Sequence, residues 1–456
     1  MALQAAERLP IRSLRPFESV DGVTVLSLHV VLLFAIPARL TFSPLGGAGS
    51  PAVLVGLVSA VFWICYRFSV SRTTVFIAQP IRRTSFLFLA ALLASFVAAC
   101  VRPINSAELQ NSQLTLLTAF GWVGILVMAC DGIPDLFRFD VYLRRLALAA
   151  GFFAALGLVQ YFSGQQLTNY LSIPGLSANQ DLGGLATRDG FNRPASTAIH
   201  PIEFGVAITA LLPICLHVAM THRHLGTLRR WFPVLMICIA VPISISRSAI
   251  IGAVVALVCL IPTWPARARR MAAVAFVALS SMVFVFLPGI IGTLTALFAG
   301  TSSDPSALSR TDSYSLAGQF IAQAPVFGRG IGTFLPKYRI LDNQYLLLVI
   351  DAGLVGCAAL LTVFITSLVC MRLVRRRSTD EGVRGAAQAL FAAIASASVG
   401  YAVFDGFAFP TFASISFLLV GLAGALWRLT AGPKQRWLTA TSASTSSGGA
   451  RGTDAH

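Results

Sequence analysis

The sequence predicts an all-α polytopic membrane protein with about twelve transmembrane helices, and three observations lead to this prediction. Of the 456 residues, 56% are hydrophobic and only 11% are charged, whereas a soluble domain has about 25% charged residues. The mean hydropathy is +0.77, and apolar runs of the length that a bilayer requires recur along most of the chain. The basic residues gather in alternate loops, as they do in membrane proteins that follow the positive-inside rule.

The predicted spans are even in number, so both termini fall on the same side of the membrane. Two of them, 231–245 and 248–263, are short, and a single long helix is the alternative; basic residues on both flanks favour a hairpin. A large outer loop, 298–344, separates the ninth span from the tenth. The spans lie near residues 23–42, 51–66, 84–101, 113–130, 145–163, 201–220, 231–245, 248–263, 271–297, 345–370, 386–408 and 410–427.

The net charge of +16 would suggest a nucleic-acid partner in a soluble protein, but here it is explained by basic cytoplasmic loops, and no nucleic acid is expected. With both termini in the cytoplasm, all but nine of the 34 Lys and Arg residues fall in segments predicted to lie inside. The nine exceptions are Arg39, Arg102, Arg188, Arg193, Arg247, Arg310, Arg329, Lys337 and Arg339.

Three regions follow from this topology. Residues 1–22 form a cytoplasmic N-terminal segment, too long and polar for a signal peptide. Residues 23–430 form one transmembrane domain with outer loops 164–200, 244–248 and 298–344. Residues 431–456 are rich in Ser, Gly and Ala, which predicts a disordered cytoplasmic tail. The eight Cys residues include no C-x-x-C pair, so neither disulfides nor a metal site is expected.

The first outer loop ends in polar residues that precede the sixth span. Arg188 and Arg193 flank Gly190, and an outward Arg runs against the general charge bias, which favours a binding role. For His200, which comes before a proline, a capped helix end and a substrate contact remain equally open. Glu203 in the first turn is interpreted as a structural residue.

The second outer loop is the tip of the predicted hairpin. Ser246 or Ser248 can cap the following helix, whose first N–H groups then face outward. A helix N-terminus beside Arg247 suits a phosphate-type anion. The alternative is that Arg247 extends toward lipid headgroups.

The third outer loop contains the densest polar cluster. Residues 306–324 predict a helix lying in the membrane interface, with Arg310 in its first turn, and Arg329 follows in a glycine-rich turn. The chain re-enters the membrane through Asp342, Asn343, Gln344 and Tyr345. Asp342 could accept a proton from a sugar hydroxyl or cap the tenth span, and both roles are compatible.

Two further carboxylates, Asp351 and Asp405, are predicted to lie inside apolar spans. A carboxylate there is costly and is usually functional or paired. The sequence does not identify a partner for either residue.

These motifs together resemble the O-antigen ligase and O-antigen polymerase superfamily of bacterial membrane glycosyltransferases. The nearest likeness is Asp342-Asn343, nine residues and then Gly353-Leu354-Val355-Gly356, which looks like a His-Asn, nine residues, Gly-x-x-Gly signature. The others are Ser246-Arg247-Ser248, Arg193 with His200-Pro201, Ser309-Arg310, and the run from Pro325 to Gly330.

The resemblance implies a glycan on a polyprenyl diphosphate as donor, transferred to a glycan or lipid-glycan acceptor at the outer face of the cytoplasmic membrane, with inversion and without a metal or other cofactor. It implies that Arg247 and Arg310 hold the diphosphate while Asp342 activates the acceptor. The substrate-binding residues would be Arg188, Arg193, His200, Ser246, Ser248, Arg329, Asn343, Gln344 and Tyr345. Asp342 stands where ligases have His, which favours a polymerase or a ligase with another acceptor.

Two other functions are consistent with twelve spans. A secondary transporter or lipid-linked-sugar flippase would show two similar halves with broken helices at matching positions, and the sequence shows no convincing half-to-half similarity. A catalytically inactive scaffold for cell-envelope assembly is the third alternative.

Overall fold

The computed structural model describes residues 21–69, 79–179, 183–188, 190–286, 289, 292–293 and 305–431. The predicted N-terminal segment and C-terminal tail lie almost wholly outside these residues, as do parts of the first and third outer loops.

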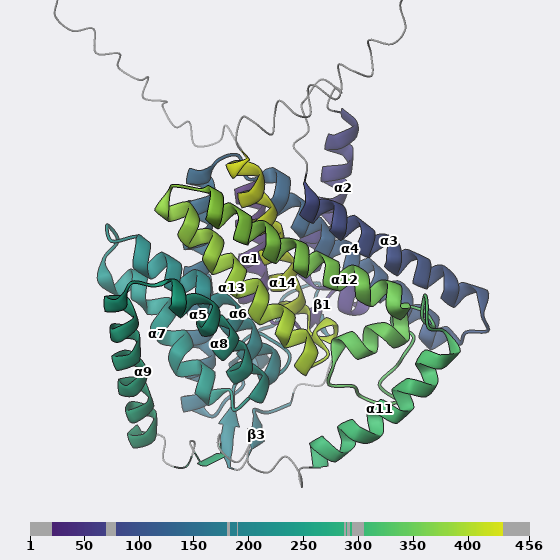
Figure 1. Ribbon diagram of the computed structural model, residues 1–456. Helices are drawn as coiled ribbons and strands as arrows, with labels where there is room; N and C mark the ends of the chain where they lie inside the picture. The colour runs from purple at the N-terminus through teal and green to yellow at the C-terminus, as the bar shows by residue number, and fades with distance from the viewer. Residues whose placement is uncertain are drawn as a thin grey trace, which may run out of the picture.

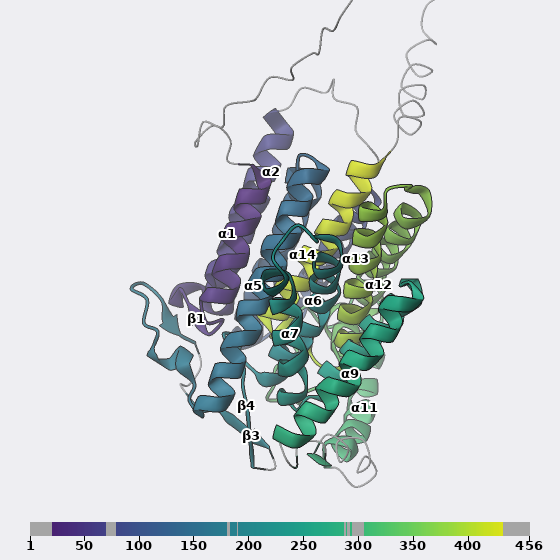
Figure 2. The same cartoon turned by 90° about the vertical axis from the view of Figure 1, so that its left-hand side faces the viewer.

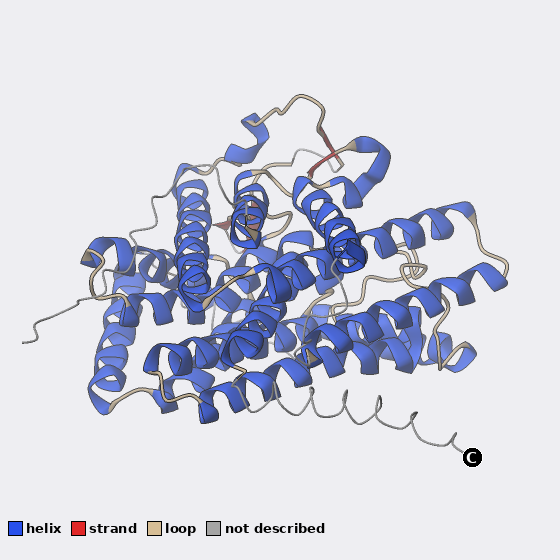
Figure 3. Ribbon diagram, turned by 90° about the horizontal axis from the view of Figure 1, so that it is seen from above, coloured by secondary structure: helices blue, strands red, loops and turns tan. Residues whose placement is uncertain are grey.

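The described part of the chain is mainly helical with very little sheet, which confirms the all-α prediction (Figure 3). Its strands are short: β1 (Leu40–Thr41) pairs with β2 (Ser177–Ala178), and β3 (Ala186–Arg188) pairs with β4 (Phe191–Arg193). The α-helices are α1 (Gly22–Ala35), α2 (Pro51–Ser69), α3 (Pro80–Val101), α4 (Ser106–Gly132), α5 (Leu136–Ser163), α6 (Pro201–Thr221), α7 (Thr227–Ile243), α8 (Arg247–Leu260), α9 (Ala266–Phe286), α11 (Pro305–Gln323), α12 (Gln344–Arg377), α13 (Glu381–Val403) and α14 (Pro410–Thr430).

Among the described residues, 8 helices are long and apolar enough to cross a membrane: α2 to α6 and α12 to α14. The protein is therefore a multi-pass membrane protein. α1 and α8 are apolar but shorter. Each of the twelve predicted spans overlaps one helix of the fold, although the number that crosses the bilayer stays a prediction.

The two short segments that were predicted to form a hairpin are separate helices, α7 and α8. Ser244, after the end of α7, and Ala249 in α8 both lie beside Gly205 at the start of α6. Gly252, farther along α8, lies beside Thr209, farther along α6. α8 therefore runs parallel to α6, away from the turn at Ser244 where α7 ends. This reversal of direction after α7 is what the hairpin prediction requires.

The helices form one bundle in which α6 and α14 are the most enclosed (Figures 1 and 2). The apolar windows of α6 and α14 are 83% and 89% buried, whereas that of α2 is only 22% buried. Because apolar side chains on an outer helix can face lipid as well as protein, α2 is placed at the periphery and α14 at the centre.

Both described ends of the chain lie at one end of the bundle, which is uppermost in Figures 1 and 2. Asp21, which caps α1, forms an ion pair with Arg138 of α5 at 2.6 Å. Arg428 near the end of α14 donates from Nε to the carbonyl oxygen of Cys130 in α4 at 2.9 Å. This agrees with the prediction that the termini share a side; which side of the membrane it is stays a prediction.

The opposite end of the bundle carries the three predicted outer loops and α11. Here the α1–α2 connection lies along the first outer loop, because Ala38 donates its N–H to Thr197 at 2.8 Å and β1 pairs with β2. The prediction of a helix over 306–324 is confirmed by α11, whose label lies at this end in Figure 1.

Candidate active site

The first and second outer loops meet at Arg193. This residue ends β4, and its Nε donates to the carbonyl oxygen of Ser244 in the α7–α8 turn at 3.1 Å. The next residue of that turn, Ile245, is fully buried and has a φ of +43°. A β-branched residue with positive φ is strained, and such strain clusters at binding and catalytic sites.

A cavity of about 150 Å³ lies where Arg193 and His200 approach Arg39 of the α1–α2 connection. Burial lowers the pKa of Arg193 to about 10, with a further contribution from Arg188 nearby, so Arg193 keeps its charge at neutral pH. Arg39 was not proposed as a site residue from the sequence. It was nevertheless one of the nine basic residues outside the inner segments, and the reasoning applied to Arg193 would have identified it.

His200 is a neutral residue at neutral pH. Its pKa is lowered to about 4, first by burial and then by the charge of Arg193, while Asp342 acts in the opposite direction. Its Nδ1 accepts the N–H of Ile202 at 3.1 Å and so caps α6. Because Nδ1 accepts, the neutral ring carries its proton on Nε2. The capping alternative is therefore correct, and it leaves the Nε2–H as a donor.

The charge of Asp342 acts on His200, so the third outer loop approaches the first as well. Asp342 is exposed, and the N-cap of α12 is the next residue, Asn343, whose Oδ1 accepts the N–H of Leu346 at 3.1 Å. The alternative in which Asp342 caps the helix is therefore wrong, and its carboxylate is not needed for that purpose.

A second carboxylate lies near Asp342. Asp405 follows the end of α13 at Val403, so the prediction that it lies inside a span is wrong. Its pKa is raised to about 7, first by burial and also by the charge of Asp342.

The two residues after Asn343 make internal contacts that fix the start of α12. Gln344 accepts the N–H of Phe407 on Oε1 at 2.8 Å and donates its own N–H to Phe404 at 3.2 Å. Tyr345 donates its hydroxyl to the carbonyl oxygen of Ser398 in α13 at 2.8 Å. Through these contacts Gln344 and Tyr345 hold the chain in place next to Asp342. Their substrate-binding role stays a prediction.

The serines of the second loop likewise have internal partners. Ser246 caps α8 by accepting the N–H of Ala249 at 3.4 Å, and Ser248 donates to the carbonyl oxygen of Val403 at 3.4 Å. Arg247 is the first residue of α8 and is half-buried. Arg310 lies on α11, but its side chain is outside the described residues.

Glu203, interpreted from the sequence as structural, is fully buried. It accepts the N–H of Ile199 at 2.8 Å and those of Thr411 and Phe412 at 2.7 and 3.2 Å. Its carboxylate thus joins the start of α6 to the start of α14.

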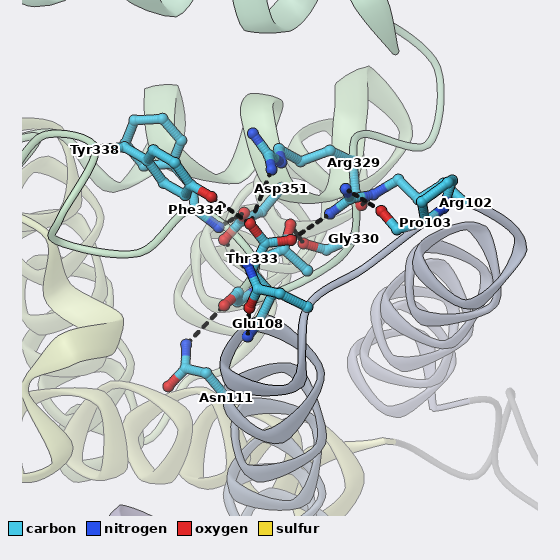
Figure 4. A network of polar contacts seen from close by, with 12 residues as sticks. Arg102, Pro103, Glu108, Asn111, Arg329, Gly330, Thr333, Phe334, Tyr338 and Asp351 are labelled. Carbon is cyan, nitrogen blue, oxygen red and sulfur yellow. Dashed lines mark hydrogen bonds and ion pairs between the residues drawn. The ribbon is translucent and has the colours of Figure 1, made fainter.

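The third loop is fastened to the bundle by a buried carboxylate that the sequence did not single out, Glu108 of α4 (Figure 4). Glu108 forms ion pairs with Arg102 at 3.0 Å and Arg329 at 3.1 Å and accepts the hydroxyl of Tyr338. The guanidinium of Arg329 also lies 5.2 Å from the ring centre of Tyr338. These contacts show that Arg329 anchors the loop, and its contact with substrate stays a prediction.

The same loop docks on α12 at a break in that helix. Asp351, buried in α12, accepts the N–H groups of Gly332 and Phe334, each at 2.9 Å, which supplies the partners that the sequence did not reveal. The break is at Gly353, with a φ of +68° and a ψ of −173°. A Cβ at Gly353 would lie 2.1 Å from the carbonyl oxygen of Val326. The glycine motif therefore lets the loop backbone approach the helix.

Gly353→Ala is expected to destabilise the protein by at least about 1–3 kcal/mol, because alanine at this φ is strained and its Cβ would displace the docked loop. The measurement is the thermal unfolding midpoint of the purified protein in detergent. Gly175→Ala is the matched control, since Gly175 has a φ of +84° but nothing within 4 Å of its missing Cβ. Equal unfolding midpoints for the two variants would show that the contact between residue 353 and the docked loop does not contribute to stability.

A comparison with family models matches residues 232–361 to the O-antigen ligase family. Residues 232–361 are an O-antigen ligase domain. This confirms the family that the sequence motifs suggested. A search of curated proteins finds no match.

The O-antigen ligase domain runs from α7 into α12 and so includes Arg247, Arg310, Asp342 and the Gly353 break. The cavity formed by Arg39, Arg193 and His200 lies before it in the sequence. The turn that accepts the hydrogen bond of Arg193 is inside the domain, so the domain and the preceding loop both contribute residues to the candidate site.

Proposed function

We propose that the protein is a membrane glycosyltransferase that transfers or polymerises a polyprenyl-diphosphate-linked glycan at the outer face of the cytoplasmic membrane. The observation that carries the proposal is the convergence of three loops at one end of the bundle, within and beside the O-antigen ligase domain. Arg193 bonds to the α7–α8 turn, and the charge of Asp342 acts on His200.

In the proposed reaction, Asp342 takes the proton from the acceptor hydroxyl as its oxygen attacks the anomeric carbon of the donor. The bond between that carbon and the diphosphate oxygen breaks, and the configuration at carbon inverts. Arg247 and Arg310 stabilise the charge of the departing polyprenyl diphosphate, with help from Arg193. This assignment uses no metal or other cofactor.

Asp342 favours a polymerase, or a ligase with another acceptor, because a carboxylate replaces the histidine of the ligase motif. The transporter alternative has no finding in its favour.

Incubation with a defined polyprenyl-diphosphate oligosaccharide tests the proposal: a ladder of products indicates a polymerase, and a single transfer indicates a ligase. The absence of product with every acceptor class, from a correctly folded protein, would contradict it.

Asp342→Asn is expected to lower the transfer rate by about 10²–10⁴-fold, because asparagine keeps the shape but cannot accept the proton. Stability should change little, since Asp342 is exposed and does not cap α12. The measurement is the initial rate of glycan transfer, together with the unfolding midpoint. Asp380→Asn is the control, because Asp380 is also exposed and caps α13. A wild-type rate in Asp342→Asn would remove Asp342 from the role of base.

A further inference from the structure

The cavity beside the candidate base is strongly basic. Its polar lining consists of Arg39, Arg193, Gln166 and His200, and no Asp or Glu is among the described residues that line it. The nearest buried carboxylate by sequence, Glu203, is occupied by three backbone N–H groups. The cavity therefore holds two guanidinium groups without a carboxylate among its described walls.

The two arginines of the cavity, Arg39 and Arg193, differ in their hydrogen-bond partners. Arg39 donates from Nη2 to Thr168 at 2.8 Å and to the side-chain oxygen of Asn169, which fixes its guanidinium plane. The hydrogen bond of Arg193 among the described residues uses Nε, so both Nη groups of this half-buried side chain remain available to a ligand in the cavity. Hydrogen bonds from a guanidinium to an anion are stronger than those to a neutral acceptor, so these donors favour an anionic ligand.

The backbone of the first outer loop sets the position of Arg39. Its carbonyl oxygen accepts the N–H of Asn179 at 3.0 Å, and its neighbour Ala38 donates to Thr197 at 2.8 Å. The first outer loop is thus bonded to both sides of Arg39. The volume of about 150 Å³ is similar to that of a cavity that admits benzene, so a single oxyanion group fits.

We propose that Arg39 and Arg193 form a subsite for an oxyanion, a phosphate or a carboxylate, that the glycan substrate carries, and that Arg39 is a binding residue. The pairing of two guanidinium forks with a neutral His200 donor suits the planar or tetrahedral oxygens of such groups. The assignment of the anion to a glycan substrate rests on the proposed function; the binding of an oxyanion does not. Two sources share this chemistry: the diphosphate of the donor lipid, and an acidic group on the sugar chain.

The test is calorimetric titration of the full-length protein in detergent with inorganic phosphate, glucuronate, a short polyprenyl diphosphate and, as the neutral control, glucose. The wild type should bind anions but not glucose, and Arg39→Gln should weaken anion binding at least about tenfold, since it removes charged hydrogen bonds. Arg39→Lys should recover part of the affinity. Lys337→Gln removes one exposed positive charge at the same end and should leave binding unchanged.

The variants also identify the source of the anion. If Arg39→Gln weakens chiefly the polyprenyl diphosphate, the subsite takes the donor; if it weakens chiefly glucuronate, it takes an acidic sugar. Equal anion affinities in wild type and Arg39→Gln, both with normal unfolding midpoints, would overturn the subsite. Because binding is measured without turnover, Arg39-dependent binding in a protein that transfers no glycan would overturn the proposed function and leave the subsite standing.

Discussion

Arg247→Ala and Arg310→Ala are each expected to lower glycan transfer by about 10²–10³-fold, the usual loss when a group that stabilises developing charge is removed. Arg247 is the first residue of α8, where the helix N-terminus adds its own affinity for a phosphate group. Arg310 is on α11, in the loop that also carries Asp342. The measurement is product yield and chain length from a defined polyprenyl-diphosphate oligosaccharide.

Membrane insertion should remain intact in both variants, since neither arginine lies in one of the eight described helices that are long and apolar enough to cross a membrane. Arg145→Ala is the control for loss of a positive charge, because Arg145 lies on α5 and bonds to Ser27 of α1 at 2.9 Å, away from the three outer loops. Unchanged product length and yield in both Arg247→Ala and Arg310→Ala would exclude the proposed diphosphate site.

Glu108→Ala is expected to release the third outer loop and to destabilise the protein by about 3 kcal/mol, at the lower end of the range for a broken buried ion pair. The lower end applies because Arg102 is 29% exposed and can regain water, whereas Arg329 is only 17% exposed. The measurements are the unfolding midpoint and the rate of tryptic cleavage after Arg329, Lys337 and Arg339.

Glu108→Gln separates charge from shape, because glutamine can still accept the hydroxyl of Tyr338. It should give an intermediate midpoint. Glu381→Ala is the control: Glu381 is exposed in the first turn of α13, and its removal should cost little. If Glu108→Ala shows wild-type cleavage and stability, the ion pairs do not fasten the loop.

The sequence predicted the helices well because apolar length and basic flanks are local properties. The turn at Ser244–Ser246 and the helix that contains Arg310 were both predicted from such signals. Asp405 was misplaced because the apolar character continues through Phe407 and Phe409, although the helix ends at Val403. Hydropathy does not detect a helix end inside an apolar run.

The contacts that build the site join residues far apart in the chain, and this explains what the sequence could not reveal. Glu108 is 221 residues from Arg329, and Arg39 is 129 residues from Thr168. Neither the hydrophobic periodicity nor the spacing of motifs in the sequence identifies pairs that are so far apart in the chain. Arg39 could have been found from its place among outward arginines, whereas Glu108 offered no comparable signal.

The docking of the third loop on the broken helix has a consequence for the motion of Asp342. Phe334 is bonded to Asp351, and Gln344 is bonded to Phe404 and Phe407, so the chain is anchored on either side of the candidate base. Asp342 therefore lies in the segment between Phe334 and Gln344, whose backbone is held at both ends. In the proposed reaction, the acceptor must therefore come to Asp342, because the anchored backbone limits how far this residue can move toward the acceptor.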